Sequence, residues 1–180
     1  MKKSWTVNGT VYTGTTLLGH GKGGYSYLVK DPTGHEFTLK QIHHEPCSYY
    51  QFGNKILAEK NDYERLKSAG ISLPQLLFLD ETQEVILKEY IPGETIDHLV
   101  LKGEITAEIQ RQIQALADLA RAHVLNLDYY PTNFIFYKGT LYYIDYECNN
   151  YDEQWSFEKW GRLYWSQTPE FLQAFKRNQN

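Results

Sequence analysis

Cysteine is scarce in this chain of 180 residues, because Cys47 and Cys148 are the only two and they stand far apart. Two cysteines without a repeated spacing argue against a disulfide framework and favour a reducing compartment. No stretch approaches the roughly 18 apolar residues of a membrane helix. The residues that follow Met1, Lys2 and Lys3 also lack the apolar core of a secretion signal. We therefore predict a soluble cytoplasmic protein without a membrane span.

Basic residues are too few to form an obvious nucleic-acid footprint. Lysine and arginine total 18 against 22 acidic residues, for a net charge of −4, and no basic run stands out. Nucleic-acid binders usually carry a basic patch, so the sequence gives no direct signal for such a partner. Apolar residues make up 42 % and aromatics 15 % of the chain, which is ample for a buried core and excludes intrinsic disorder.

The first half of the chain is predicted to consist of β-strands with one inserted helix. Asn8-Gly9 favours a type I′ hairpin turn, and residues 25–29 and 37–42 alternate as strands do. A second strand pair is predicted at residues 75–80 and 84–91. Between the pairs, residues 54–69 are predicted to be a helix that ends at Gly70 and buries Ile56, Leu57, Tyr63 and Leu66.

The second half is predicted to be mainly helical. Residues 106–124 place four apolar side chains on one helix face. Short strands follow at residues 134–137 and 141–144, and an aromatic helical tail over residues 151–175 is expected to cover the core. This order predicts an α+β chain in two layers or lobes. The helix face consists of Ile109, Ile113, Leu116 and Ala120.

Gly19, Gly21 and Gly24 form a G-x-G-x-x-G motif. A dinucleotide site needs a helix directly after the glycines, whereas the pattern here predicts a strand, a turn and another strand. We therefore place the glycines at the tip of an antiparallel hairpin, as in the flap that kinases lay over ATP phosphates. Glycine lets backbone amides approach phosphates without a Cβ in the way. A glycine-rich surface turn is the alternative for this motif alone.

Lys40 lies at the end of the next predicted strand, where it is a candidate ligand for the α- and β-phosphates. Glu59 on the following helix is a candidate for the carboxylate that holds this lysine, and Glu64 is its rival one turn further on. We favour Glu59 because Tyr63 and Leu66 then face the sheet.

The C-terminal half supplies a second set of polar residues. Asp128 and Asn133 have the D-x-x-x-x-N spacing, and Asp145 follows a short predicted hairpin. A carboxylate is needed to take the proton of an acceptor hydroxyl, a role we give to Asp128. Mg²⁺ needs hard oxygen ligands, which Asn133 and Asp145 would supply. Each residue alone fits an Asx-turn or a strand-end aspartate, whereas the ordered set with Lys40 and Glu59 is improbable by chance.

This ordered set resembles the protein-kinase-like superfamily over about residues 15–147. The resemblance implies a two-lobed α+β fold, with a β-rich N-lobe at residues 1–91 and a truncated C-lobe at 92–180. It also implies ATP and Mg²⁺ as cofactors. The carbonyl of Glu89 and the amide of Ile91 would then hold the adenine edge. Lys88 would occupy the gatekeeper position, where we expect an acidic partner, Glu59 or Asp145, or an amine that reaches water.

Two atypical branches of the superfamily resemble the chain in particular runs of residues. RIO kinases and the small kinase of the threonylcarbamoyl-adenosine tRNA-modification complex resemble the chain at Glu59 and in the run AGISLP. Choline-kinase and aminoglycoside-phosphotransferase relatives resemble it in the run IDYECNNYD. The usual H-R-D reads Asn126-Leu127-Asp128 here, and Glu147 replaces the glycine of D-F-G. Without that arginine, control by a phosphorylated activation loop is not expected.

The function predicted from these residues is Mg-ATP-dependent transfer of the γ-phosphate to a hydroxyl by an atypical serine/threonine protein kinase-like enzyme. A small-molecule kinase and an ATP-binding or ATPase regulatory subunit are the alternatives. A protein substrate or partner subunit is favoured over a metabolite, because the aromatic tail is expected to pack on the core and leave the face near Asp128 open.

The run HHEPC offers four further polar side chains. Adjacent residues do not converge as well-spaced metal ligands do, so this run is predicted to be a solvated loop. The four residues are His43, His44, Glu45 and Cys47.

Overall fold

The structure is a computed structural model that describes residues 3–46 and 53–177, so Cys47 lies outside the described residues. The chain folds into two compact units. The first consists of Met1–Asn61 and Pro74–Tyr90, and the second of Asp62–Leu73 and Ile91–Asn180. A curled antiparallel sheet is combined with helices, so the predicted α+β, kinase-like fold class is confirmed.

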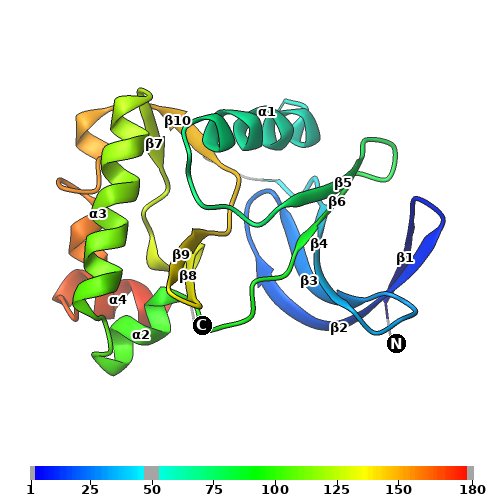
Figure 1. The fold of residues 1–180 in the computed structure, drawn as a ribbon, viewed down its shortest axis with the longest axis horizontal. Helices are drawn as coiled ribbons and strands as arrows, with labels where there is room; N and C mark the ends of the chain where they lie inside the picture. Colours follow the sequence, from blue (N-terminus) through cyan, green and yellow to red (C-terminus); the bar gives the residue numbers. More distant parts are fainter. Residues whose placement is uncertain (1–2, 47–52, 178–180) are drawn as a thin grey trace. The chain divides into compact units, whose positions relative to one another are not determined.

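The first unit contains a six-stranded sheet in the order β1-β2-β3-β4-β6-β5 (Figure 1). Asn8 and Gly9 have positive φ angles of 46° and 77° at the first hairpin turn, and Val7 pairs with Thr10 across it. These are the φ values that a type I′ turn requires. The strands are β1 (Ser4–Val7), β2 (Thr10–His20), β3 (Gly24–Lys30), β4 (Glu36–Ile42), β5 (Leu76–Asp80) and β6 (Val85–Glu89).

The two faces of this sheet have different chemistry. Leu39 and Leu87 pair with each other and belong to an apolar cluster on one face. Since side chains alternate along a strand, Lys40 and Lys88 share the opposite face. Lys88 is 5 % exposed, so the predicted strand register, which turns it inward, is confirmed. The apolar cluster is completed by Trp5, Val7, Val29 and Val85.

Helix α1 (Lys55–Ser68) starts after Asn54, whose side-chain oxygen accepts the backbone N–H of Leu57 at 3.0 Å. It ends before Gly70, which has a φ of 80°. Ile56, Tyr63 and Leu66 are buried, as predicted. Leu57 is 43 % exposed, and its assignment to the buried face was wrong. The inner stripe runs through residues 56, 59, 63 and 66, whereas Leu57 lies about 100° around the helix from Ile56.

The second unit is built around helix α3 (Ala107–Ala122), whose N-cap Thr106 accepts the backbone N–H of Ile109 through its side chain. The four predicted apolar residues on α3 are buried. Two short sheets accompany the helix, β7 (Leu125–Leu127) with β10 (Cys148–Asn150) and β8 (Phe134–Tyr137) with β9 (Thr140–Tyr143). The other elements are α2 (Ile96–Lys102), α4 (Pro169–Arg177) and the short 3₁₀ turns η1 (Pro131–Asn133), η2 (Glu153–Trp155) and η3 (Gly161–Tyr164).

The aromatic tail packs on the core of the second unit, as predicted. Phe157, Trp165 and Phe171 are buried in the main apolar cluster, while Trp160 and Phe175 pack partly buried against it. The tail forms two 3₁₀ turns and α4 rather than one continuous helix. Among the described residues, no helix is both long enough and apolar enough to cross a membrane.

Candidate functional site

The glycine motif lies at the tip of the β2–β3 hairpin, as predicted. Gly19 pairs with Ser26 and His20 with Tyr25, and the N–H of Gly21 donates to the carbonyl of Gly24 at 3.0 Å. The motif therefore forms a strand, a tight turn and a strand. A helix-initiating dinucleotide loop is excluded for these glycines. We call residues 19–24 the flap.

The flap glycines differ in how closely they are packed. Among the described residues, a Cβ at Gly19 or Gly21 would meet nothing within 4 Å, whereas a Cβ at Gly24 would lie 2.5 Å from the carbonyl oxygen of Gln41. Gly24 is thus required by the close approach of β3 to β4. Gly23, which stands outside the motif, would bring a Cβ to 3.4 Å from both Lys40 Nζ and Glu59 Oε1. Gly23 was not predicted as a site residue, because it is not one of the three glycines of the motif.

These contacts predict different results for alanine at two flap positions. Gly24→Ala forces two strands apart and is expected to lower the free energy of unfolding by about 1–3 kcal/mol. Gly19→Ala adds a methyl group in open space and is expected to leave that free energy nearly unchanged. Urea denaturation of both variants measures the difference. Equal destabilisation by the two alanines would contradict the packing role of Gly24.

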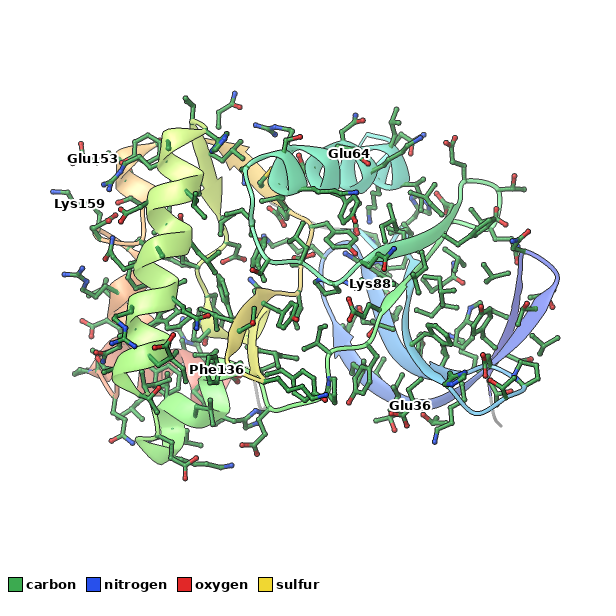
Figure 2. All side chains as sticks on the ribbon, viewed as in Figure 1. Glu36, Glu64, Lys88, Phe136, Glu153 and Lys159 are labelled. Atoms are coloured by element: carbon green, nitrogen blue, oxygen red, sulfur yellow. The ribbon has the colours of Figure 1, made fainter. Side chains whose placement is uncertain are left out.

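Lys40 on β4 forms an ion pair with Glu59 on α1 through Nζ and Oε1. The two side chains are each 12 % exposed, so the pair is largely removed from water. Glu64 is exposed (Figure 2), and the choice of Glu59 over Glu64 as the partner of Lys40 is confirmed. The second carboxylate oxygen of Glu59 is buried and has no hydrogen-bond partner among the residues that the structure describes. The role of the pair in nucleotide binding stays a prediction.

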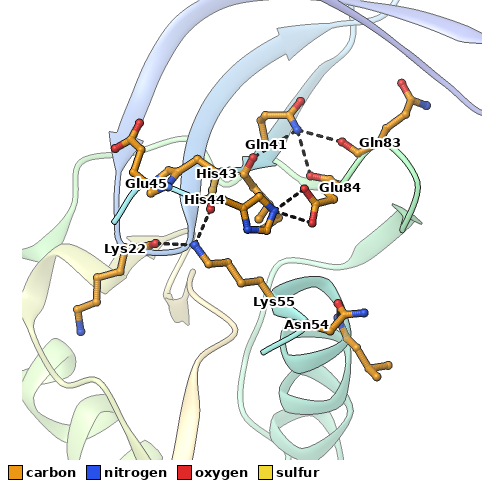
Figure 3. A network of polar contacts seen from close by, with 11 residues as sticks. Lys22, Gln41, His43, His44, Glu45, Asn54, Lys55, Gln83 and Glu84 are labelled. Carbon is orange, nitrogen blue, oxygen red and sulfur yellow. Dashed lines mark hydrogen bonds and ion pairs between the residues drawn. The ribbon is translucent and has the colours of Figure 1, made fainter. Parts of the chain in front are cut away.

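Two side chains outside the predicted kinase-like motifs contact backbone carbonyls of the flap; Figure 3 shows the contact that Lys55 makes. Lys55 is buried and donates through Nζ to the carbonyls of Lys22, at 3.2 Å, and His43. The Nε2 of His43 lies 2.9 Å from the carbonyl oxygen of Gly21. A cation in the first turn of a helix opposes the helix dipole. A lysine at this unfavourable helix position was therefore the feature of the sequence that could have indicated a specific hydrogen-bond partner for Lys55.

In the second unit, Asp128 directly follows β7, and hydrogen bonds fix the loop after it. The N–H of Tyr130 donates to Asp128 Oδ1 at 3.1 Å, and Asn133 Nδ2 donates to the Asp128 carbonyl at 3.2 Å. The carbonyl of Asn133 accepts the N–H of Ile144 at 2.9 Å. Asp145 comes next and accepts the N–H of Tyr146 at 2.8 Å. This network connects the segment before Asp145 to the loop that contains Asp128 and Asn133.

The buried side chain of Tyr143 links two backbone segments near this loop. It is fully buried, its hydroxyl donates to the carbonyl of Glu147 at 2.7 Å, and it accepts the N–H of Asp128 at 3.2 Å. Burial raises the pKa of Tyr143 well above its ordinary value, and the charges of Asp145 and Asp128 add to this effect. The hydroxyl therefore stays protonated and remains a donor. Tyr143 was predicted only as a strand residue, so its hydrogen bonds to Asp128 and Glu147 were not anticipated.

Further contacts support the loop from behind. Trp165 donates its indole N–H to the carbonyl of Tyr129 at 2.8 Å, which links the aromatic tail to the residue after Asp128. Cys148 pairs with Leu127 across β10 and β7. Burial and then the charge of Asp62 raise the pKa of the Cys148 thiol to about 12, so this cysteine is a packing residue rather than a nucleophile.

Two known proteins are similar to this chain over part of its length. The archaeal KEOPS complex subunit Bud32 of Pyrococcus abyssi is 27 % identical over 105 residues, covering 55 % of this chain and 46 % of the relative. The EKC/KEOPS complex subunit bud32 of Dictyostelium discoideum is 32 % identical over 62 residues, covering 34 % and 25 %. The resemblance to atypical protein-kinase-like proteins is confirmed. No family model matches the chain. The chain spans less than half of the length of these Bud32 relatives.

The segment expected to hold adenine straddles the two units. Glu89 is the last residue of β6, where its N–H donates to the carbonyl of Gln75 at 2.9 Å and its carboxylate accepts the N–H of Gln75 at 3.1 Å. Ile91 is buried at the start of the second stretch of the other unit. Adenine recognition by Glu89 and Ile91, and the acidic partner expected for Lys88, stay predictions.

The donor set of the second unit fits a magnesium ion. Asp145 brings a carboxylate, and Asn133 directs its amide nitrogen to the Asp128 carbonyl, so Oδ1 is the atom of Asn133 that would bind a metal. Hard oxygen donors of this kind are what Mg²⁺ prefers. Asn126, at the first position of the usual H-R-D, is buried and donates to the carbonyl of Asp152 at 2.8 Å. The side chain of Asn126 is therefore used in a hydrogen bond to the backbone of Asp152.

Proposed function

We propose that this chain is a Mg-ATP-dependent phosphotransferase of the atypical serine/threonine protein kinase-like type. The observation that supports this most is the largely buried ion pair between Lys40 and Glu59 beneath the glycine flap. An ammonium held in this way is ready to bind phosphate oxygens, and Gly23 leaves room beside it. In this proposal Gly19, Gly21 and Gly24 cover the phosphates, and Glu59 orients Lys40.

The second unit supplies the remaining groups of the proposed reaction. Asp128 takes the proton of the acceptor hydroxyl as general base, and Asn133 and Asp145 hold Mg²⁺. The bound cation would neutralise charge on the phosphate oxygens. The fixed backbone around Asp128, anchored by Tyr143 and Trp165, supports a base that keeps one orientation through the reaction.

A partner subunit is part of the proposal, because both Bud32 relatives are named as subunits of a KEOPS complex. We propose that this chain likewise works with a protein partner. The same relatives favour a second candidate function, an ATP-binding or ATPase subunit that regulates a complex. The two functions differ in whether the γ-phosphate ends on a protein hydroxyl or in water.

Mg-ATP is expected to stabilise the protein by mass action, by about 2.7 kcal/mol when the ligand concentration is 100 times its dissociation constant. For a chain of this size each kcal/mol raises the melting temperature by about 2–4 °C. Differential scanning calorimetry with Mg-ATP, and with ATP plus EDTA as control, measures the effect. An unchanged melting temperature with saturating Mg-ATP would contradict the proposed function.

A further inference from the structure

Three potential metal ligands meet at the base of the flap. His20 ends β2, while His43 and Glu45 follow β4, and their ligand atoms lie within 4.8 Å of one another. The sequence predicted that the HHEPC run would not converge on a metal. His44 agrees with this, since it turns to Glu84 at 2.7 Å (Figure 3). His43 and Glu45 instead gain a third ligand from across the sheet, which local spacing could not reveal.

The distances suit a small divalent ion. His20 Nε2 lies 3.3 Å from Glu45 Oε2. Two ligands at bond lengths of about 2.1 Å in a tetrahedral site are separated by about 3.4 Å. His20 Nε2 and Glu45 Oε2 therefore already have the separation of two ligands of one ion. Two imidazoles and one carboxylate favour Zn²⁺ and similar transition metals over Mg²⁺ or Ca²⁺.

The surrounding groups already orient the carboxylate. Tyr25 donates from its hydroxyl to Glu45 Oε1 at 2.6 Å, which leaves Oε2 facing His20. This hydrogen bond is the main cause that lowers the pKa of Glu45 and raises that of Tyr25. The ring of Tyr25 also stacks on His20, with centroids 4.2 Å apart and an angle of 3° between the planes. Hydrogen-bonded supports of this kind accompany protein metal ligands.

His43 links the three ligands to the flap. Its Nδ1 accepts the backbone N–H of Glu45 at 3.2 Å, so its Nε2 carries the proton and donates to the carbonyl of Gly21, 2.9 Å away. A metal-bound histidine commonly donates its other N–H to a backbone carbonyl. A metal bound at Nδ1 would therefore replace the hydrogen bond from the Glu45 N–H, while the donation from Nε2 to Gly21 is kept.

We propose that His20, His43 and Glu45 form a binding site for one divalent transition-metal ion, such as Zn²⁺, that fastens the flap to the end of β4. The site lies entirely within the first unit and requires neither ATP nor catalysis. Metal binding would join His20, at the end of β2, to the segment after β4 whose His43 contacts the carbonyl of Gly21, and so restrain the flap.

Isothermal titration of the full chain with Zn²⁺, in a Cys47→Ser background that removes a competing thiol, tests the site. One equivalent is expected to bind. His20→Ala and Glu45→Gln should each weaken binding by at least about 10-fold, and Tyr25→Phe by about 10-fold through loss of its support to Glu45. His44→Ala is the matched control, because it removes a neighbouring imidazole that pairs with Glu84, and it should leave the affinity unchanged.

Hydrogen exchange supplies a second readout that is independent of affinity. Zn²⁺ is expected to slow amide exchange in residues 19–24 of the parent protein and to leave it unchanged in the His20→Ala variant. The proposal is overturned if Zn²⁺ does not bind, or if His44→Ala weakens binding as much as His20→Ala does. It is also overturned if bound Zn²⁺ leaves exchange in the flap unaltered.

Discussion

Replacing Asp128 by asparagine is expected to slow phosphoryl transfer from Mg-ATP by about 10²- to 10⁴-fold, the usual contribution of a general base. The amide keeps an oxygen for the N–H of Tyr130, so the loop keeps its conformation and ATP binding stays nearly unchanged. The variant loses the basic carboxylate that would take the acceptor proton. Single-turnover transfer of labelled γ-phosphate measures the rate, and calorimetry measures the affinity.

Two other variants test whether the loss of rate is specific to Asp128. Asp145→Asn is expected to weaken Mg²⁺-dependent nucleotide binding, because a neutral amide attracts the cation less than a carboxylate does. Asp118→Asn removes an exposed acid of α3 that pairs with Arg121, and it should leave both rate and affinity unchanged. Equal loss of nucleotide affinity in the Asp128 and Asp145 variants would show that their roles are wrongly assigned.

The parts of the fold that follow from local chemistry could be predicted from the sequence. Asn8-Gly9 fixed the first hairpin because few residues accept two successive positive φ angles. The apolar stripe on α3 predicted its buried face because its period matches the helix. The pairing of Lys40 with Glu59 also followed, since positions 59 and 64 are five residues apart and therefore lie about 140° from each other around the helix.

The features that escaped prediction depend on distant contacts or on very short elements. Strands β7 and β10 are three residues each, too short for a periodic signal, and they pair across 20 residues of sequence. Leu57 was misplaced because the predicted face was too wide. Gly24 has its close contact with Gln41 in the neighbouring strand, and the bridge through Tyr143 joins backbone groups that no motif names. Except for Leu57, contacts between segments that are distant in the sequence decide these features.

Lys40→Met is expected to lower the free energy of unfolding by several kcal/mol, because breaking a buried ion pair costs about 3–5 kcal/mol. Methionine retains the length and apolar stem of lysine but leaves the Glu59 carboxylate largely buried without its cation. The 12 % exposure of both side chains places the expected loss near the lower end of that range. Urea denaturation measures it. Lys102→Met breaks the exposed pair with Glu94 and is the control, expected to leave the free energy of unfolding nearly unchanged.

The double variant Lys40→Met with Glu59→Met separates stability from function. Replacing both members of a buried pair by apolar residues of similar size is often neutral or stabilising, so the double variant should regain most of the stability that Lys40→Met loses. Mg-ATP affinity should not return, because the ammonium that would bind the phosphates is absent from both variants. If the double variant stayed as unstable as the single one, the pair would not be the cause of the loss. If it bound Mg-ATP as tightly as the parent protein, the Lys40–Glu59 pair would be a structural contact alone, and the proposed phosphate-binding role of Lys40 would be wrong.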